Sequence, residues 1–68
     1  MPSTVVKTIA YENGHSRLTV TFVSGRVYEY YLVPPSVAEA FGAARSKGTY
    51  FNQHIRDRYT CREITSAA

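Results

Sequence analysis

The alternation of apolar and polar residues across residues 18–23, with a turn dipeptide on each side, constrains the fold of this chain more than any other feature. Successive side chains of a strand point to opposite faces. The segment therefore predicts a strand with Leu18, Val20 and Phe22 on one face and Thr19, Thr21 and Val23 on the other. Asn13-Gly14 and Ser24-Gly25 are typical of tight hairpin turns, which predicts an antiparallel neighbour on each side.

The two neighbouring segments have the composition of strands. Residues 4–11 are rich in β-branched side chains, and residues 26–33 alternate, with Tyr28, Tyr30 and Leu32 opposite Val27, Glu29 and Tyr31. Pro34-Pro35 lacks backbone donors, so the hydrogen-bond ladder stops there. The first half of the chain is predicted to be a three-stranded antiparallel meander.

A first helix is predicted directly after the prolines. Ser36 and Glu39 have the spacing of a capping box. The apolar residues that follow recur at i, i+3, i+4 and i+7, which is one stripe of a helix: Val37, Ala40, Phe41 and Ala44.

A second amphipathic helix is predicted over residues 50–59. Gly48 suits a left-handed stop of the first helix, and Thr49 suits a cap of the second. Phe51, Ile55 and Tyr59 recur every four positions on one side. Residues 59–64 alternate weakly, which fits either a frayed helical extension or a short edge strand.

The resulting fold class is α+β, a three-stranded antiparallel β-meander followed by two α-helices packed on one face (β-β-β-α-α), with a short C-terminal extension left open. A chain of 68 residues has room for one domain, 1–68, with an ordered core expected over about 4–62 and a tail at 65–68. Its 44% hydrophobic and 19% charged residues are typical of a globular protein rather than a disordered one.

Charge and cysteine content restrict partners and compartment. The formal charge of +3 mildly favours anionic partners, although it also serves solubility. The single cysteine, Cys61, cannot form an internal disulfide, which is typical of the reducing cytoplasm. We find no signal-peptide pattern and no apolar run long enough for a membrane span, so a cytoplasmic protein without a membrane partner is expected.

Catalysis, metal binding and cofactor binding have no support in the sequence. Cys61, His15 and His54 are the groups that titrate near neutral pH, and the two histidines belong to distant elements. We find no paired ligand spacing for zinc and no glycine-rich phosphate loop. We therefore expect a non-enzymatic protein with no metal and no cofactor.

A basic strip on the second helix and its flanks is the first candidate binding surface. The residues proposed to contact a polyanion there are Arg45, Lys47, Arg56 and Arg62. The alternative is a solvated helix face. For Arg56 a salt bridge to Glu29 or Glu12 would be a structural role, and Arg58 can either contact a ligand or pair within the fold.

The uncovered face of the sheet is the second candidate surface. If helices cover one side, the other carries Arg17, Thr19, Thr21, Glu29 and Tyr31. An exposed Tyr31 can stack bases, as tyrosines of sheet-based RNA binders do. The alternative is that tyrosine is simply a good strand residue.

One set of residues resembles the KTSC domain family. It comprises Tyr28-x-Tyr30, the Val33-Pro34 step, the apolar helix with Phe41, and Ser46-x-Gly48-x-Tyr50-Phe51-Asn52-x-x-Ile55-Arg56-x-x-Tyr59. The family is named after the C-terminal region of some lysyl-tRNA synthetases and also occurs as short bacterial proteins. The resemblance covers roughly residues 5–59 and implies a compact α+β module with an RNA-related context. It brings no catalytic residues.

The motif residues also have physical interpretations. Phe51, Ile55 and Tyr59 predict the buried stripe, Gly48 permits a turn between helices, and Asn52 is expected to hydrogen-bond loop backbone. The sequence thus predicts a non-catalytic module that binds RNA or another polyanion through its second helix. The alternative is a protein-protein adaptor that uses a strand edge or the Tyr31 face.

Overall fold

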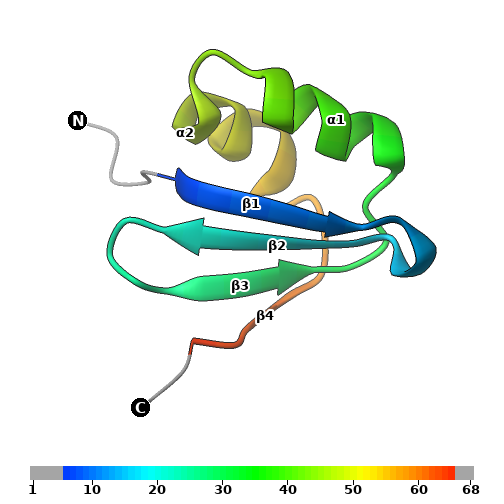
Figure 1. Cartoon of the computed structure of the whole chain (residues 1–68), viewed down its shortest axis with the longest axis horizontal. Helices are drawn as coiled ribbons and strands as arrows, with labels where there is room; N and C mark the ends of the chain where they lie inside the picture. Colours follow the sequence, from blue (N-terminus) through cyan, green and yellow to red (C-terminus); the bar gives the residue numbers. More distant parts are fainter. Residues whose placement is uncertain (1–5, 66–68) are drawn as a thin grey trace.

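The computed structural model describes residues 6–65, in which a twisted antiparallel sheet has the strand order β1-β2-β3-β4 (Figure 1). The strands are β1 (Val6–Glu12), β2 (Arg17–Phe22), β3 (Val27–Tyr30) and β4 (Cys61–Glu63). The helical elements are α1 (Pro35–Ala43), α2 (Lys47–Tyr50) and a π-helical turn, η2 (Phe51–Ile55). The expected α+β class with an antiparallel sheet and two helices is confirmed, but the sheet has four strands rather than three.

The pairing register separates an inner face of the sheet, toward the helices, from an outer face. Leu18 pairs with Tyr30 and Val20 with Tyr28, whereas Thr19 pairs with Glu29. Because paired residues share a face, the first two pairs lie on the inner face and the last on the outer face. Leu18, Val20 and Tyr30 are buried, so the predicted phase of the central strand is confirmed.

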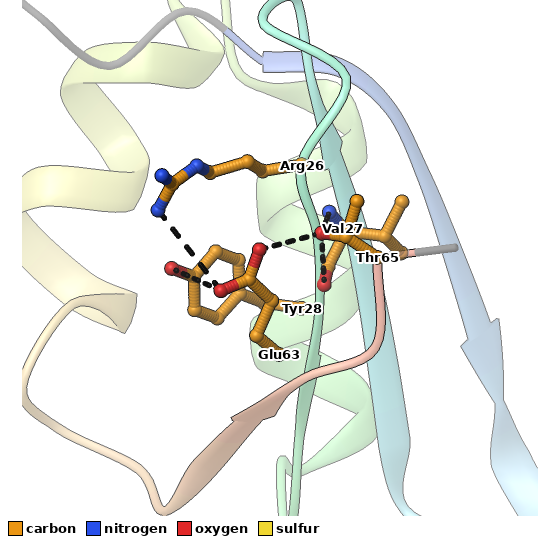
Figure 2. A network of polar contacts seen from close by, with 5 residues as sticks. All are labelled: Arg26, Val27, Tyr28, Glu63 and Thr65. Carbon is orange, nitrogen blue, oxygen red and sulfur yellow. Dashed lines mark hydrogen bonds and ion pairs between the residues drawn. The ribbon is translucent and has the colours of Figure 1, made fainter. Parts of the chain in front are cut away.

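The fourth strand resolves the ambiguity over residues 59–64 in favour of an edge strand. Tyr30 pairs with Cys61 and Glu29 with Arg62. Figure 2 shows what holds its end: the Val27 amide donates to Thr65 Oγ1 (2.8 Å), and the Thr65 hydroxyl donates to Glu63 Oε2 (2.7 Å). Thr65 was expected in a terminal tail and instead contacts β3, while residues 66–68 and the expected strand residues 4 and 5 lie outside the described residues.

The two hairpin connections differ from each other. The predicted two-residue turn at Asn13-Gly14 is wrong, because Asn13–His15 form a 3-10 turn (η1) and the left-handed position falls on Ser16 (φ 50°). A tertiary contact holds it there, since the Val33 amide donates to the Ser16 carbonyl (2.9 Å). The second connection does use its glycine: Gly25 has φ 98° and donates to the Phe22 carbonyl (2.9 Å).

Helix α1 starts two residues earlier than a Ser36 cap requires. Pro34 is the N-cap residue and makes no side-chain cap bond, so the predicted capping box is wrong. Pro35 occupies the first turn, where its missing amide costs no helical hydrogen bond. The buried side chains are Phe41, as predicted, and Ala38, which the predicted stripe missed, whereas Ala40 is exposed.

The second helical segment, residues 47–55, starts and ends earlier than predicted. Ser46 is its cap, accepting from the Thr49 amide (3.3 Å), and Gly48 lies inside α2 instead of stopping α1. The segment ends in a π turn, in which the Arg56 amide donates to the Phe51 carbonyl (2.8 Å). The segment ends before Arg56, whose backbone is extended (φ −60°, ψ 130°), and Asp57 follows in the left-handed region (φ 62°).

The core lies between the inner face and the helical layer. Phe51 is at its centre, with ring centroids 5.2 Å from Phe22, 5.6 Å from Tyr30 and 6.4 Å from Phe41. Tyr59 packs against this core from the turn after η2. The buried residues are Leu18, Val20, Tyr30, Val33, Ala38, Phe41, Phe51 and Ile55.

Leu32 combines 81% exposure with a left-handed backbone (φ 59°) where the chain leaves β3. A non-glycine residue there costs about 1–2 kcal/mol, and an exposed leucine regains little by burial. We expect Leu32→Gly to raise the free energy of unfolding by about 0.5–1 kcal/mol in urea denaturation, after the extra backbone entropy of glycine is deducted. The control is Val23→Gly, 62% exposed and without a positive φ, which should lower stability. Equal losses in both variants would contradict the prediction.

Candidate polyanion-binding surface

Acidic and basic residues are distributed unevenly along the chain. Four arginines and one lysine lie in residues 45–62, together with one carboxylate, Asp57. The sheet neutralises most of its own charges. Arg17 on the outer face pairs with Glu12 and, at 3.7 Å from Nε to Oε2, with Glu29. The hydrogen bond to Glu12 raises the pKa of the Arg17 guanidinium.

A second pairing lies where β3 meets β4. In Figure 2 the Glu63 carboxylate faces the Arg26 guanidinium, with 4.0 Å between Nη1 and Oε1, and it also accepts from the Tyr28 hydroxyl at 3.4 Å. Two cations in the first half of the chain lie beside carboxylates of the sheet, Arg17 and Arg26. Both form an ion pair with one of these carboxylates. Residues 45–58, which we call the basic segment, keep a net excess of positive charge.

The cations of the basic segment are exposed to different degrees. Arg45 is exposed in the connection between α1 and α2. Lys47 is half-buried, and its Nζ donates to the Ala44 carbonyl (3.4 Å) at the end of α1, which is a structural role. The Arg45 guanidinium is therefore more accessible to a ligand than the Lys47 ammonium group.

The contacts of Arg56 are local. Its Nη1 donates to Asn52 Oδ1 (3.4 Å), and its Nε lies 4.0 Å from Asp57 Oδ2, with both charged side chains more than half exposed. Exposed pairs of this kind contribute little to stability. The suggested partners of Arg56, Glu12 and Glu29, pair with Arg17 instead. The expected bond from Asn52 to loop backbone is replaced by this contact with Arg56.

Arg58 lies in the turn that follows η2. Its amide donates to the Ile55 carbonyl (3.1 Å), while its exposed side chain forms no ion pair with another residue of 6–65. Internal pairing, one of the two alternatives for Arg58, is therefore not observed within that range. Arg56 and Arg58 flank Asp57 on an exposed turn.

Arg62 and Tyr31 do not lie with the other candidates. Arg62 is opposite Glu29 in the register of β4 and β3, which places it on the outer face of the sheet. The Tyr31 hydroxyl donates to Glu29 Oε1 (2.9 Å), and this bond raises the pKa of the phenol. Tyr31 is half-buried rather than fully exposed. The five candidate residues are thus divided between two surfaces of the molecule.

A column of three rings reaches the surface within the basic segment. Tyr50 stacks on buried Phe41 (centroids 5.5 Å apart, planes at 15°). Its ring also contacts the His54 ring in a tilted arrangement (centroids 4.4 Å apart, planes at 35°). His54 is exposed. A stacking role for His54 was not predicted from the sequence. The i, i+4 spacing from Tyr50 was the available signal.

Within residues 6–65, no cluster of three or more metal-binding side chains occurs, and no helix has the length and hydrophobicity needed to cross a bilayer. An open groove of about 520 Å³ lies beside the start of α1, and its charged side chain is Glu39. An acidic groove does not suit a polyanion.

The residues that carried the family resemblance hold structural positions. Tyr30, Phe41, Phe51 and Ile55 are buried, and Tyr28 and Tyr59 are half-buried against them. Pro34 caps α1, and Gly48 lies in α2. Most of the motif is therefore explained by packing and helix capping. Its exposed members are Pro34, Ser46, Asn52 and Arg56, of which Pro34 and Ser46 are the helix caps.

Known proteins share this sequence and fold. The sequence model of the KTSC domain matches residues 2–59. A lysine–tRNA ligase of Nostoc punctiforme is 43% identical over 61 residues, which is 90% of this chain and 11% of the ligase. An uncharacterized protein of Stutzerimonas stutzeri is 34% identical over 59 residues, 87% of this chain and 83% of that protein.

The fold comparison agrees with the sequence comparison. The crystal structure of a KTSC domain protein from Yersinia pestis has a TM-score of 0.85 and 29% identity, and the match covers 94% of this chain and 93% of that one. The chain spans only 11% of the length of the Nostoc punctiforme ligase, so the similarity concerns one segment of that enzyme. The protein belongs to the KTSC domain family.

Proposed function

We propose that this protein is a small non-catalytic binding module that binds RNA or another polyanion through its basic segment. The separation of charge supports the proposal most strongly. Arg17 and Arg26 each lie beside carboxylates of the sheet, whereas the three exposed arginines of the basic segment, Arg45, Arg56 and Arg58, share a single carboxylate, Asp57. Such a surface attracts phosphate groups and releases their counterions on binding.

RNA is the polyanion that the relatives favour. Lysine–tRNA ligases of Nostoc punctiforme and Trichormus variabilis contain a segment similar to this chain, and tRNA is the RNA in their names. Arg62 and Tyr31 are not part of the proposed surface, since both are placed on the outer face of the sheet beside Glu29.

A protein-protein adaptor is the second candidate. Its support is the exposed β4 edge, all three residues of which are exposed, together with Leu32. An open strand edge can pair with an extended segment of another protein.

Salt-dependent RNA binding tests the proposal. We expect Arg56→Gln and Arg58→Gln each to weaken binding of a fluorescent tRNA and of an unrelated single strand alike, and to reduce the slope of log K against log salt by about one. The matched control is Arg26→Gln, which removes the same charge from an exposed arginine beside the sheet and should leave the slope unchanged. Fluorescence anisotropy at several salt concentrations gives both quantities.

Two results would assign the binding site to another surface or eliminate it. Binding that survives Arg56→Gln and is lost in Tyr31→Ala would place the site on the outer face of the sheet. Absence of saturable binding by the parent protein at low salt would eliminate the polyanion function and favour the adaptor.

A further inference from the structure

The ring column Phe41–Tyr50–His54 ends at an open ring. Phe41 is fully buried and anchors the column in the core, and Tyr50 is held further by its hydroxyl, which donates to the Val37 carbonyl (3.5 Å). Among the aromatic side chains of residues 6–65, Tyr50 is the one ring neighbour of the imidazole, at 4.4 Å between centroids, and His54 is exposed. The column is therefore rigid at its base and exposed at its tip.

The His54 imidazole contributes little to the stability of the fold, so packing does not explain its position. His54 is exposed, and its ring nitrogens make no hydrogen bond to another residue within 6–65. Ile55, its neighbour in η2, is fully buried and holds that turn in place. A flat ring is thus presented to solvent by a well-packed element, which is how proteins present a stacking platform.

Cations of the basic segment precede and follow His54 along the chain. Lys47 begins the helical segment, and Arg56 and Arg58 follow its end, so charges lie on both sides of His54 along the chain. At about 1.5 Å per residue, the helical segment is only about 13 Å long. An aromatic face with flanking cations is the combination that binds single-stranded nucleic acid, through base stacking and phosphate contacts together.

We propose that the outer face of His54 stacks on an unpaired base of single-stranded RNA, which extends the column Phe41–Tyr50–His54 by one ring, while Arg56 and Arg58 contact the adjoining phosphates. This inference rests on the proposed RNA-binding function and narrows its ligand class. A duplex does not suit the platform, because its base faces are already stacked inside the helix. The surface therefore prefers an unpaired strand to a duplex of the same sequence.

The test compares an unstructured uridine-rich RNA of twelve nucleotides with a duplex RNA of equal length. We expect His54→Ala to weaken single-strand binding at least fivefold, which is the lower range for loss of one stacked base, and to change duplex binding less than twofold. His54→Trp, which restores a ring, should bind the single strand at least as tightly as the parent. Gln53→Ala is the control, since Gln53 is the exposed neighbour without a ring.

Two further readouts separate stacking from charge. The salt slope of His54→Ala should equal that of the parent, because no phosphate contact is lost. A 2-aminopurine base in the strand should be quenched by the parent and by His54→Trp, and not by His54→Ala. Circular dichroism of each variant confirms that the fold is retained.

Failure of this inference can be distinguished from failure of the proposed function. If the parent binds RNA and His54→Ala binds the single strand as tightly as the parent, the stacking platform is disproved. RNA binding by the basic segment is then still supported. Equal loss of duplex and single-strand binding, or a parent that prefers the duplex, also overturns the inference. If the parent binds no RNA of either kind, the proposed function and the platform are overturned together.

Discussion

Replacing Phe51 with alanine is expected to abolish folding or nearly so. The side chain is 4% exposed and contacts rings from both layers, with centroids 5.2 Å from Phe22 and 6.4 Å from Phe41. Truncation of a buried phenylalanine costs about 3–5 kcal/mol, against a total stability of roughly 3–10 kcal/mol for a chain of this length. Circular dichroism at increasing urea concentration should show that the transition is lost or moved to very low urea.

Val23→Ala is the control for this truncation. Val23 is 62% exposed in the β2–β3 connection, so removal of its methyl groups should change the free energy of unfolding by about 0.5 kcal/mol or less. If Phe51→Ala unfolds cooperatively within a few degrees of the parent, Phe51 is not at the centre of the core.

The second large effect is expected from a lysine placed at Val20. Val20 is fully buried on the inner face of β2, where an unpaired ammonium group has no carboxylate partner among the core residues. Burial of an unpaired charge costs several kcal/mol, so we expect Val20→Lys to be unfolded at 25 °C. Thermal denaturation and amide chemical-shift dispersion both report the result.

The matched variant is Thr19→Lys, one residue away and on the opposite face. Thr19 pairs with Ala10 on one side and Glu29 on the other, so a lysine there has a carboxylate across the strands. Its stability should stay within about 1 kcal/mol of the parent. Similar losses for the two variants would mean that the sheet does not have one buried and one open face.

The candidate surface could be predicted only in part from the sequence. The excess of cations after residue 44 is evident from the sequence. Arg56 is exposed as expected of a binding strip, and Arg58, for which the sequence left two alternatives open, is exposed as well. Arg62 was grouped with them because it is close in sequence. It lies on the outer face of the sheet because residues 61–63 form a strand opposite β3, and that pairing depends on a segment more than thirty positions earlier in the chain.

The ring column, too, could be predicted only in part from the sequence. Tyr50 and His54 have helical spacing, so their stacking is a local property that the sequence contains. The contact of Tyr50 with Phe41 joins two helical elements, and no spacing rule predicts it. Only the packed structure shows that His54 ends a column that begins in the core.

The sequence by itself determined the elements whose signals are local. The alternation around Val20 set the two faces of the sheet, the paired prolines ended the strands, and the four-residue spacing of Phe51 and Ile55 set the buried side of the second helical segment. The tertiary structure alone decided the fourth strand, the left-handed positions of Ser16 and Leu32, and the end of the helical segment at Ile55. The fourth strand and the position of Ser16 depend on hydrogen bonds between distant segments. Their free energy exceeds the weak local preferences that sequence patterns report.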